Sequence, residues 1–142
     1  MGFFDRIFAS SKGYPTLDEA SPAADRIARI SEQLESLSKQ VHKPLEVVPG
    51  DEGSYVFIGK PPKDFGIAWI KDDRVCSLKT LADEHGVKPE EMKSISERLR
   101  KIYEENQNDR RFSAKVGQKN IVVTPSEQLR SQVSEVIRQA SH

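Results

Sequence analysis

Residues 78–125 constrain the fold most, because their apolar spacing changes from helical to strand-like within one short stretch. Ser77 can cap a helix over Leu78–His85, and Gly86 is placed to end it in a left-handed conformation. Pro89 fits the first position of a second helix. The apolar residues of this second helix recur on one face and are Met92, Ile95, Leu99 and Ile102. This spacing predicts a pair of helices that cross at a tight turn.

A β-hairpin is predicted after the second helix. Apolar and polar side chains alternate over residues 111–116, which is typical of a half-buried strand. Gly117-Gln118 offers a tight turn, and Asn120–Thr124 would be the returning strand. One face of the hairpin is therefore apolar, with Phe112, Ala114 and Val116, and the other face is basic.

The segments LADEHGVKPEEMKSISERL and RRFSAKVGQKNIVVTP resemble the helix-turn-helix and the wing of bacterial winged-helix proteins. The nearest likeness is to the winged-helix subunit of the bacterial chromosome-segregation condensin, over about residues 77–125. In a DNA-binding member of this class, the second helix enters the major groove and the hairpin touches phosphate. The resemblance implies DNA contacts from the helix residues Lys88, Glu90, Lys93, Ser94 and Glu97 and from the wing residues Arg111, Lys115 and Lys119.

The charges favour protein contact over DNA contact for this element. Glu90, Glu91 and Glu97 would each oppose binding to phosphates. The whole chain has a formal net charge of zero, so it has no global attraction for nucleic acid. Residues 110–142 carry six Lys and Arg against two Asp and Glu, and DNA binding therefore remains an alternative.

A long helix is predicted over residues 21–41, where Ser21 can cap and Pro22 fits the first helical position. Its apolar residues recur at alternating spacings of three and four, as in a coiled coil, and include Ile27, Ile30, Leu34 and Leu37. The flanking positions are mostly uncharged and lack the paired charges that set register in a free coiled coil. Two interpretations stay open, a helix packed on its own sheet and a helix pair between subunits.

The first residues, MGFFDRIF, place Phe3, Phe4, Ile7 and Phe8 on one side of a short helix. These side chains are expected to cover the chain's own core, a twin subunit or a partner protein. Membrane-surface binding is the least favoured use, because Asp5 cancels Arg6 and two turns bury little apolar area. Residues 1–20 are interpreted as this apolar segment and a linker, and residues 21–142 as one domain.

A small antiparallel meander is predicted between the long helix and the helix pair. Its strands are expected at Leu45–Val48, Ser54–Gly59, Phe65–Ile70 and Arg74–Ser77. Phe65–Ile70 is apolar on both faces, which suits a central strand, and Trp69 is expected in the core. The closing helix is predicted to begin with Thr124 as its cap and Pro125 at its first position.

No motif in the sequence indicates an enzyme, a metal site or a cofactor. His42, His85 and His142 have no metal-ligand spacing, and the single Cys76 cannot form an intramolecular disulfide. The absence of a disulfide suits a cytoplasmic protein. Paired carboxylates such as Asp51-Glu52 and Asp72-Asp73 are interpreted as solvated charge in turns.

The predicted fold class is α+β, with a long N-terminal helix, a small antiparallel β-meander, a helix-turn-helix with a β-hairpin wing, and a C-terminal helix. The predicted function is a non-enzymatic protein-interaction or assembly module that forms a homodimer. DNA binding by the winged helix is the first alternative. The second follows from the element order, which is similar to that of small dimeric secretion chaperones, whose members bind extended segments of client proteins.

Overall fold

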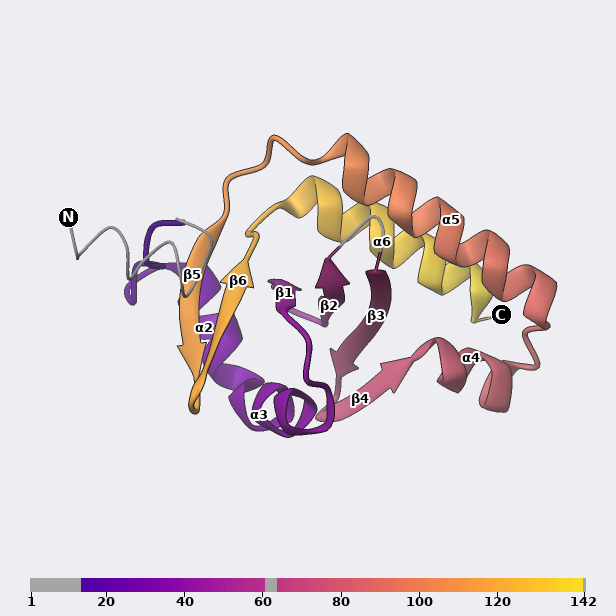
Figure 1. Ribbon diagram of the computed structural model, residues 1–142, viewed down its shortest axis with the longest axis horizontal. Helices are drawn as coiled ribbons and strands as arrows, with labels where there is room; N and C mark the ends of the chain where they lie inside the picture. The colour runs from indigo at the N-terminus through magenta and orange to yellow at the C-terminus, as the bar shows by residue number, and fades with distance from the viewer. Residues whose placement is uncertain (1–13, 61–63, 142) are drawn as a thin grey trace.

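The computed structural model describes residues 14–60 and 64–141. It is an α+β structure with a central sheet between two layers of helices (Figure 1). The helices are α2 (Pro22–Arg29), α3 (Ser31–Gln40), α4 (Leu78–His85), α5 (Pro89–Glu105) and α6 (Glu127–Ala140). The strands are β1 (Leu45–Val48), β2 (Ser54–Lys60), β3 (Asp64–Lys71), β4 (Arg74–Ser77), β5 (Phe112–Val116) and β6 (Lys119–Val123).

All six strands belong to one mixed sheet with the order β4-β3-β2-β1-β6-β5. The predicted meander and the predicted hairpin therefore lie in one sheet, a point that the sequence left open. The hairpin joins the meander because β6 pairs in parallel with β1, where Glu46 lies opposite Val122 and Val47 opposite Val123. All the other strand pairs are antiparallel.

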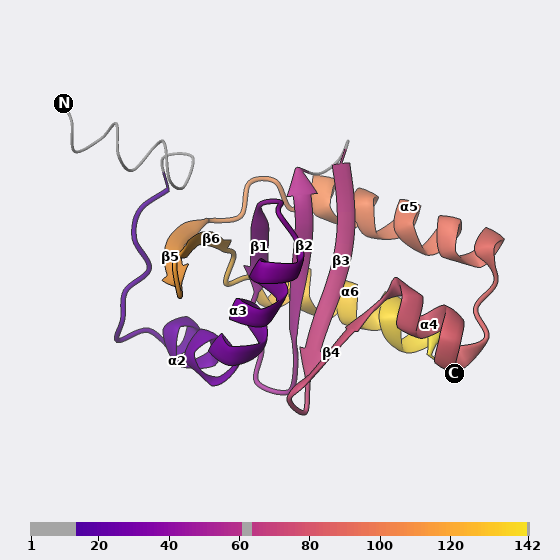
Figure 2. The ribbon, with the colours of Figure 1, turned by 60° about the horizontal axis from the view of Figure 1, so that its bottom comes forward.

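Each face of the sheet has its own apolar core. The α2/α3 side buries Leu34 and Val47, while the α4/α5/α6 side buries Phe57 and Leu99. Strand β3 serves both cores, since Ala68 and Ile70 face one side and Ile67 and Trp69 the other. The predicted central strand with Trp69 in the core is confirmed. Figure 2 shows α2 and α3 on one side of the sheet and α5 and α6 on the other.

The predicted long helix is wrong in one respect, because it is divided at Ile30 into α2 and α3. Ile30 has φ −114° and ψ 15°, outside the helical range, although no glycine or proline stands there. Ile27 of α2 and Leu34 of α3 nevertheless pack in the same core. The break at Ile30 lets both helices stay in contact with the twisted sheet, whereas one straight helix would diverge from it.

The end signals of the helix pair α4 and α5 are confirmed, and that of α6 is corrected. Ser77 is the N-cap of α4, and Gly86 ends it in the left-handed region with φ 66°. The cap of α6 is Ser126, whose side chain accepts from the Leu129 N–H at 3.1 Å. Thr124 lies two residues before this cap, and its hydroxyl is directed into the interior, where it donates to Glu46.

Candidate functional site

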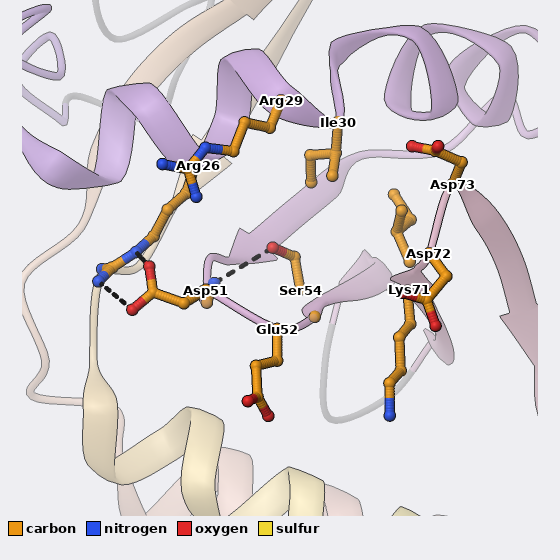
Figure 3. A pocket seen from close by; sticks show the side chains of 12 residues that line it. Arg26, Arg29, Ile30, Asp51, Glu52, Ser54, Lys71, Asp72 and Asp73 are labelled. Atoms are coloured by element: carbon orange, nitrogen blue, oxygen red, sulfur yellow. Dashed lines mark hydrogen bonds and ion pairs between the residues drawn. The ribbon is translucent and has the colours of Figure 1, made fainter.

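A polar hollow of about 610 Å³ lies between α2, residues 50–54 and residues 70–73 (Figure 3). Arg26 crosses it and donates to both carboxylate oxygens of Asp51, at 2.7 and 3.2 Å. The hydrogen bonds from Arg26 lower the pKa of Asp51 below its ordinary value. The hydroxyl of buried Ser54 accepts from the Gly50 N–H at 3.2 Å. These contacts hold the β1–β2 loop against α2, so Arg26, Asp51 and Ser54 have a structural role.

The carboxylates around the hollow do not gather into a metal site. Asp51 and Glu52 are exposed in one turn, and Asp72 and Asp73 are exposed in another, as predicted for solvated charge. Within residues 14–60 and 64–141, no three His, Cys, Asp or Glu side chains are grouped to hold a metal ion. His42 and His85 are exposed, and Cys76 is a half-buried free thiol. His142 lies outside the described residues.

A buried polar cluster links β1, α5 and the β5–β6 hairpin, and Glu46 is its centre. The Glu46 carboxylate accepts from Tyr103 Oη at 2.7 Å, Arg111 Nε at 3.0 Å and Thr124 Oγ1 at 2.7 Å. The side chains of Glu46 and Arg111 are only 12 % and 6 % exposed. Arg111 also donates from Nη1 to the carbonyl oxygens of residues 107 and 109, at 2.9 and 3.0 Å. Arg111 is therefore buried in the protein, and does not lie on the exposed basic face of the hairpin where the alternation of side chains predicts it.

Tyr103 lies between this cluster and the apolar core of the α4/α5/α6 side. The Arg111 guanidinium stands 5.3 Å from the Tyr103 ring centroid, and Phe57 packs edge-on to the same ring at 5.0 Å. Burial, followed by the Glu46 carboxylate, raises the pKa of Tyr103 well above its ordinary value. Burial lowers the pKa of Arg111, but the interactions with Glu46 and Tyr103 have a larger effect, so the pKa of Arg111 is raised. The cluster thus keeps a neutral phenol beside a permanent ion pair.

We expect the stability of the protein to fall more steeply at high pH than that of a Tyr103→Phe variant. A folded-state pKa above the unfolded value of about 10 gives a contribution that is complete below that pH and is lost as the pH rises. Tyr103→Phe should cost about 1 kcal/mol near neutral pH, from one lost hydrogen bond. The measurement is urea unfolding at several pH values on either side of pH ~10. If the free energy of unfolding fell equally with pH in the two proteins above that pH, the raised pKa of Tyr103 would be contradicted.

The lysines expected at a DNA surface do not lie together. Lys88 and Lys93 are exposed at the start of α5, whereas Lys115 is exposed on β5. Both ribbon views place the start of α5 at one end of the molecule and the β5–β6 hairpin at the other (Figures 1 and 2). Lys119 is half-buried and donates to the carbonyl oxygens of Lys43 at 2.6 Å and Val41 at 3.4 Å. The structure therefore separates the expected helix contacts from the expected wing contacts.

The predicted interface residues of the first helix lie mainly in the protein's own core. Ile27, Leu34 and Leu37 are buried against the sheet, and Ile30 is partly buried beside them. Of the two interpretations, packing on the chain's own sheet therefore accounts for these side chains, and they offer no exposed seam to a partner. The expected interface residues Phe3, Phe4, Ile7 and Phe8 lie outside the described residues.

A groove runs between α2 and the edge strand β5. It has a volume of about 550 Å³ and is lined by residues 16, 17 and 19, by α2 and α3 residues from 24 to 35, and by residues 113–117. We call it the β5 groove. On its helical side, Ala24, Ala28 and Ser31 follow at intervals of four and three and so share one helix face. Their small side chains leave the space open, and Ala114 and Val116 form the opposite wall.

The edge of β5 beside this groove is already half occupied by the chain itself. The backbone N–H of Ser113 donates to the carbonyl oxygen of Pro15 at 2.7 Å, and the carbonyl oxygen of Ser113 accepts from the Leu17 N–H at 2.8 Å. Thr16 and Ser113 thus form a parallel β-bridge. Outward-facing backbone groups recur at every second residue of a strand, so those of Lys115 point the same way. Within the described part of the chain, no backbone partner covers the Lys115 groups.

No motif in the sequence marks the β5 groove. Its nearest signal is the pair of small, uncharged residues Ala24 and Ser31, which flank the apolar face of the first helix. Pro15 and Ser113 are 98 residues apart in the sequence, so no local pattern predicts the pairing between residues 15–17 and β5.

Comparisons with protein families, with curated proteins and with solved structures found no match for this chain. The described residues contain no helix long and apolar enough to cross a lipid bilayer.

Proposed function

We propose that this protein is a non-enzymatic protein-interaction module that binds an extended segment of another protein in the β5 groove. The observation that carries the proposal is the half-occupied edge of β5. The chain's own residues 15–17 pair with Ser113, and among the described residues none pairs with the adjacent outward backbone groups of Lys115, which can take a second segment. Adding a strand to an exposed sheet edge is a common mode of peptide recognition, in which backbone hydrogen bonds supply affinity.

The groove defines the chemistry of the segment. Ala114 and Val116 face the α2/α3 core, so alternate side chains of a strand added to β5 would point into the groove between them and Ala28. The wall is apolar there, while Glu19, Glu35 and Lys115 stand around it. A segment with apolar side chains at alternate positions and polar ones between them fits this arrangement. Such a client is the kind expected from the similarity in element order to secretion chaperones.

Ala28→Glu is expected to weaken binding by about tenfold or more, because it places a charge in an apolar groove. The probe is a set of peptides selected on the wild-type protein from a random displayed library, with affinity measured by fluorescence anisotropy. Ala28 is exposed, so the variant should fold normally. Ser36→Glu is the matched control, since Ser36 is exposed on α3 and lies outside the groove.

Backbone pairing is tested on the peptide side. Methylation of successive backbone nitrogens in a selected peptide should abolish binding at alternate positions only, as expected for a strand with one edge paired. The proposal is overturned if no peptide is enriched, or if the enriched peptides bind wild type and Ala28→Glu equally well.

A further inference from the structure

Strand β4 is the other edge of the sheet, and its outer side is partly open. Just before β4, the Asp73 carbonyl oxygen accepts from Gln33 Nε2 of α3 at 3.4 Å. It pairs with β3, and no other strand of the described residues adjoins it. Asp72 and Asp73 both have positive φ, at 53° and 63°, and form a two-residue hairpin turn. In such a hairpin the flanking pair Lys71 and Arg74 exchange hydrogen bonds, so the next residue, Val75, directs its N–H and C=O outward.

A contact of Ser77 supports this assignment. Ser77 stands two residues after Val75, and its N–H donates to Thr80 Oγ1 at 3.0 Å, away from β3. The open part of the edge is therefore centred on Val75.

Val75 also has an unusual side chain for the surface. Of the large hydrophobic side chains in the described part of the protein, only Val75 is exposed, at 38 %. Val75 lies opposite Ile70, which belongs to the core on the α2/α3 side, so it extends that core to the sheet edge. An unpaired backbone edge beside an exposed apolar side chain is suited to cover by another strand.

We propose that β4 pairs with β4 of a second copy of this chain, in antiparallel orientation about a two-fold axis at Val75. A residue whose N–H and C=O both point outward can exchange two hydrogen bonds with the same residue of a symmetry-related strand. The same patch then serves both copies, as in an isologous interface. The pairing would join the sheets of the two copies and place the two Val75 side chains against each other. The β5 edge is unsuited to this arrangement because residues 15–17 already cover half of it.

The charges along β4 complement this register. Pairing at Val75 places Asp73 opposite Ser77 of the second copy and brings the acidic turn toward Lys79, which is exposed at the start of α4. Arg74 lies opposite Cys76 of the second copy, and in its own chain it forms an ion pair with Glu84. Within β4 no like charges lie directly opposite each other, so the register avoids the charge pairs that destabilise paired strands.

The mass of the full chain in solution tests the pairing. Sedimentation equilibrium should give twice the 16.0 kDa of the chain for wild type, and the monomer mass for Val75→Lys, in which two ammonium groups would meet at the axis. Val75 is exposed, so this variant should fold, and circular dichroism checks it. Ser131→Lys adds the same charge on the exposed side of α6 and should remain dimeric.

Cross-linking tests the register. In a Cys76→Ala background, Val75→Cys should form an intermolecular disulfide on air oxidation, because directly paired residues stand about 5.5 Å apart. Ser131→Cys in the same background should not. A monomeric wild-type protein, a dimeric Val75→Lys variant or equal cross-linking of the two cysteine variants would each overturn the proposal. Peptide binding at the β5 groove is measured separately, and its loss would leave this dimer unaffected.

Discussion

Replacing Arg111 by methionine is expected to lower the free energy of unfolding by about 3–5 kcal/mol. The substitution keeps an unbranched apolar side chain of similar length but leaves the Glu46 carboxylate buried without its counter-charge. The carbonyl oxygens of residues 107 and 109, which accept from Arg111, also lose their donor. The measurement is urea unfolding followed by the fluorescence of Trp69.

Two further variants distinguish the effect of breaking the buried ion pair from the effect of removing an arginine charge. Arg138→Met removes an exposed arginine that pairs with Glu135 three residues earlier, and should cost far less than Arg111→Met, because solvent screens both charges. The double variant Glu46→Leu with Arg111→Met removes both buried charges and should be more stable than Arg111→Met alone, although Tyr103 and Thr124 then lose their acceptor. A cost for Arg111→Met no larger than that of Arg138→Met would contradict the buried ion pair.

Local signals were sufficient to predict most of the elements. Ser77 and Gly86 mark the ends of α4 because a hydroxyl cap and a left-handed glycine act within a few residues of the chain. The predicted bounds of β1 and β4 match the structure, since alternating apolar residues and turn residues define them. The α+β class follows from these elements.

The arrangement of the sheet depends on contacts that have no local signal. β6 pairs with β1 across more than 70 residues, and this pairing converts a meander and a hairpin into one sheet. Ile30 divides the first helix without a glycine or proline, so the apolar spacing alone predicted one helix. Thr124 has the residue type of a cap, but its hydroxyl donates a hydrogen bond to Glu46, which is distant in the sequence.

A chemical signal for the buried cluster is present in the sequence. Glu46 stands in the apolar strand Leu45–Val48, and a carboxylate in a buried strand requires a cationic or hydrogen-bonding partner. The alternation of apolar and polar residues in the hairpin, taken alone, predicts that Arg111 lies on the outer, basic face of the wing. Only the pairing of β1 with β6 shows that the two residues meet.

Leu34→Ala is expected to lower the free energy of unfolding by about 2–5 kcal/mol, because Leu34 is fully buried and its removal leaves a cavity between α3 and the sheet. The same experiment decides whether the first-helix seam belongs to the chain's own core or to a partner. If Leu34 packs within one chain, the loss is the same at low and at high protein concentration, and the mass in solution does not change. If the helices instead paired between subunits, the variant would dissociate and its loss of stability would depend on concentration.

Ser36→Ala is the matched control for this prediction, because Ser36 is exposed on the same helix and its truncation should change stability by less than about 0.5 kcal/mol. Ile30→Ala adds a second comparison, since Ile30 is only partly buried at the junction of α2 and α3 and should cost less than Leu34→Ala. The order Leu34, Ile30, Ser36 in decreasing cost is what packing against the chain's own sheet requires. A larger cost at Ile30 than at Leu34 would place the critical apolar contact at the partly exposed junction, where a partner can reach it, and would revive the intersubunit interpretation of this helix.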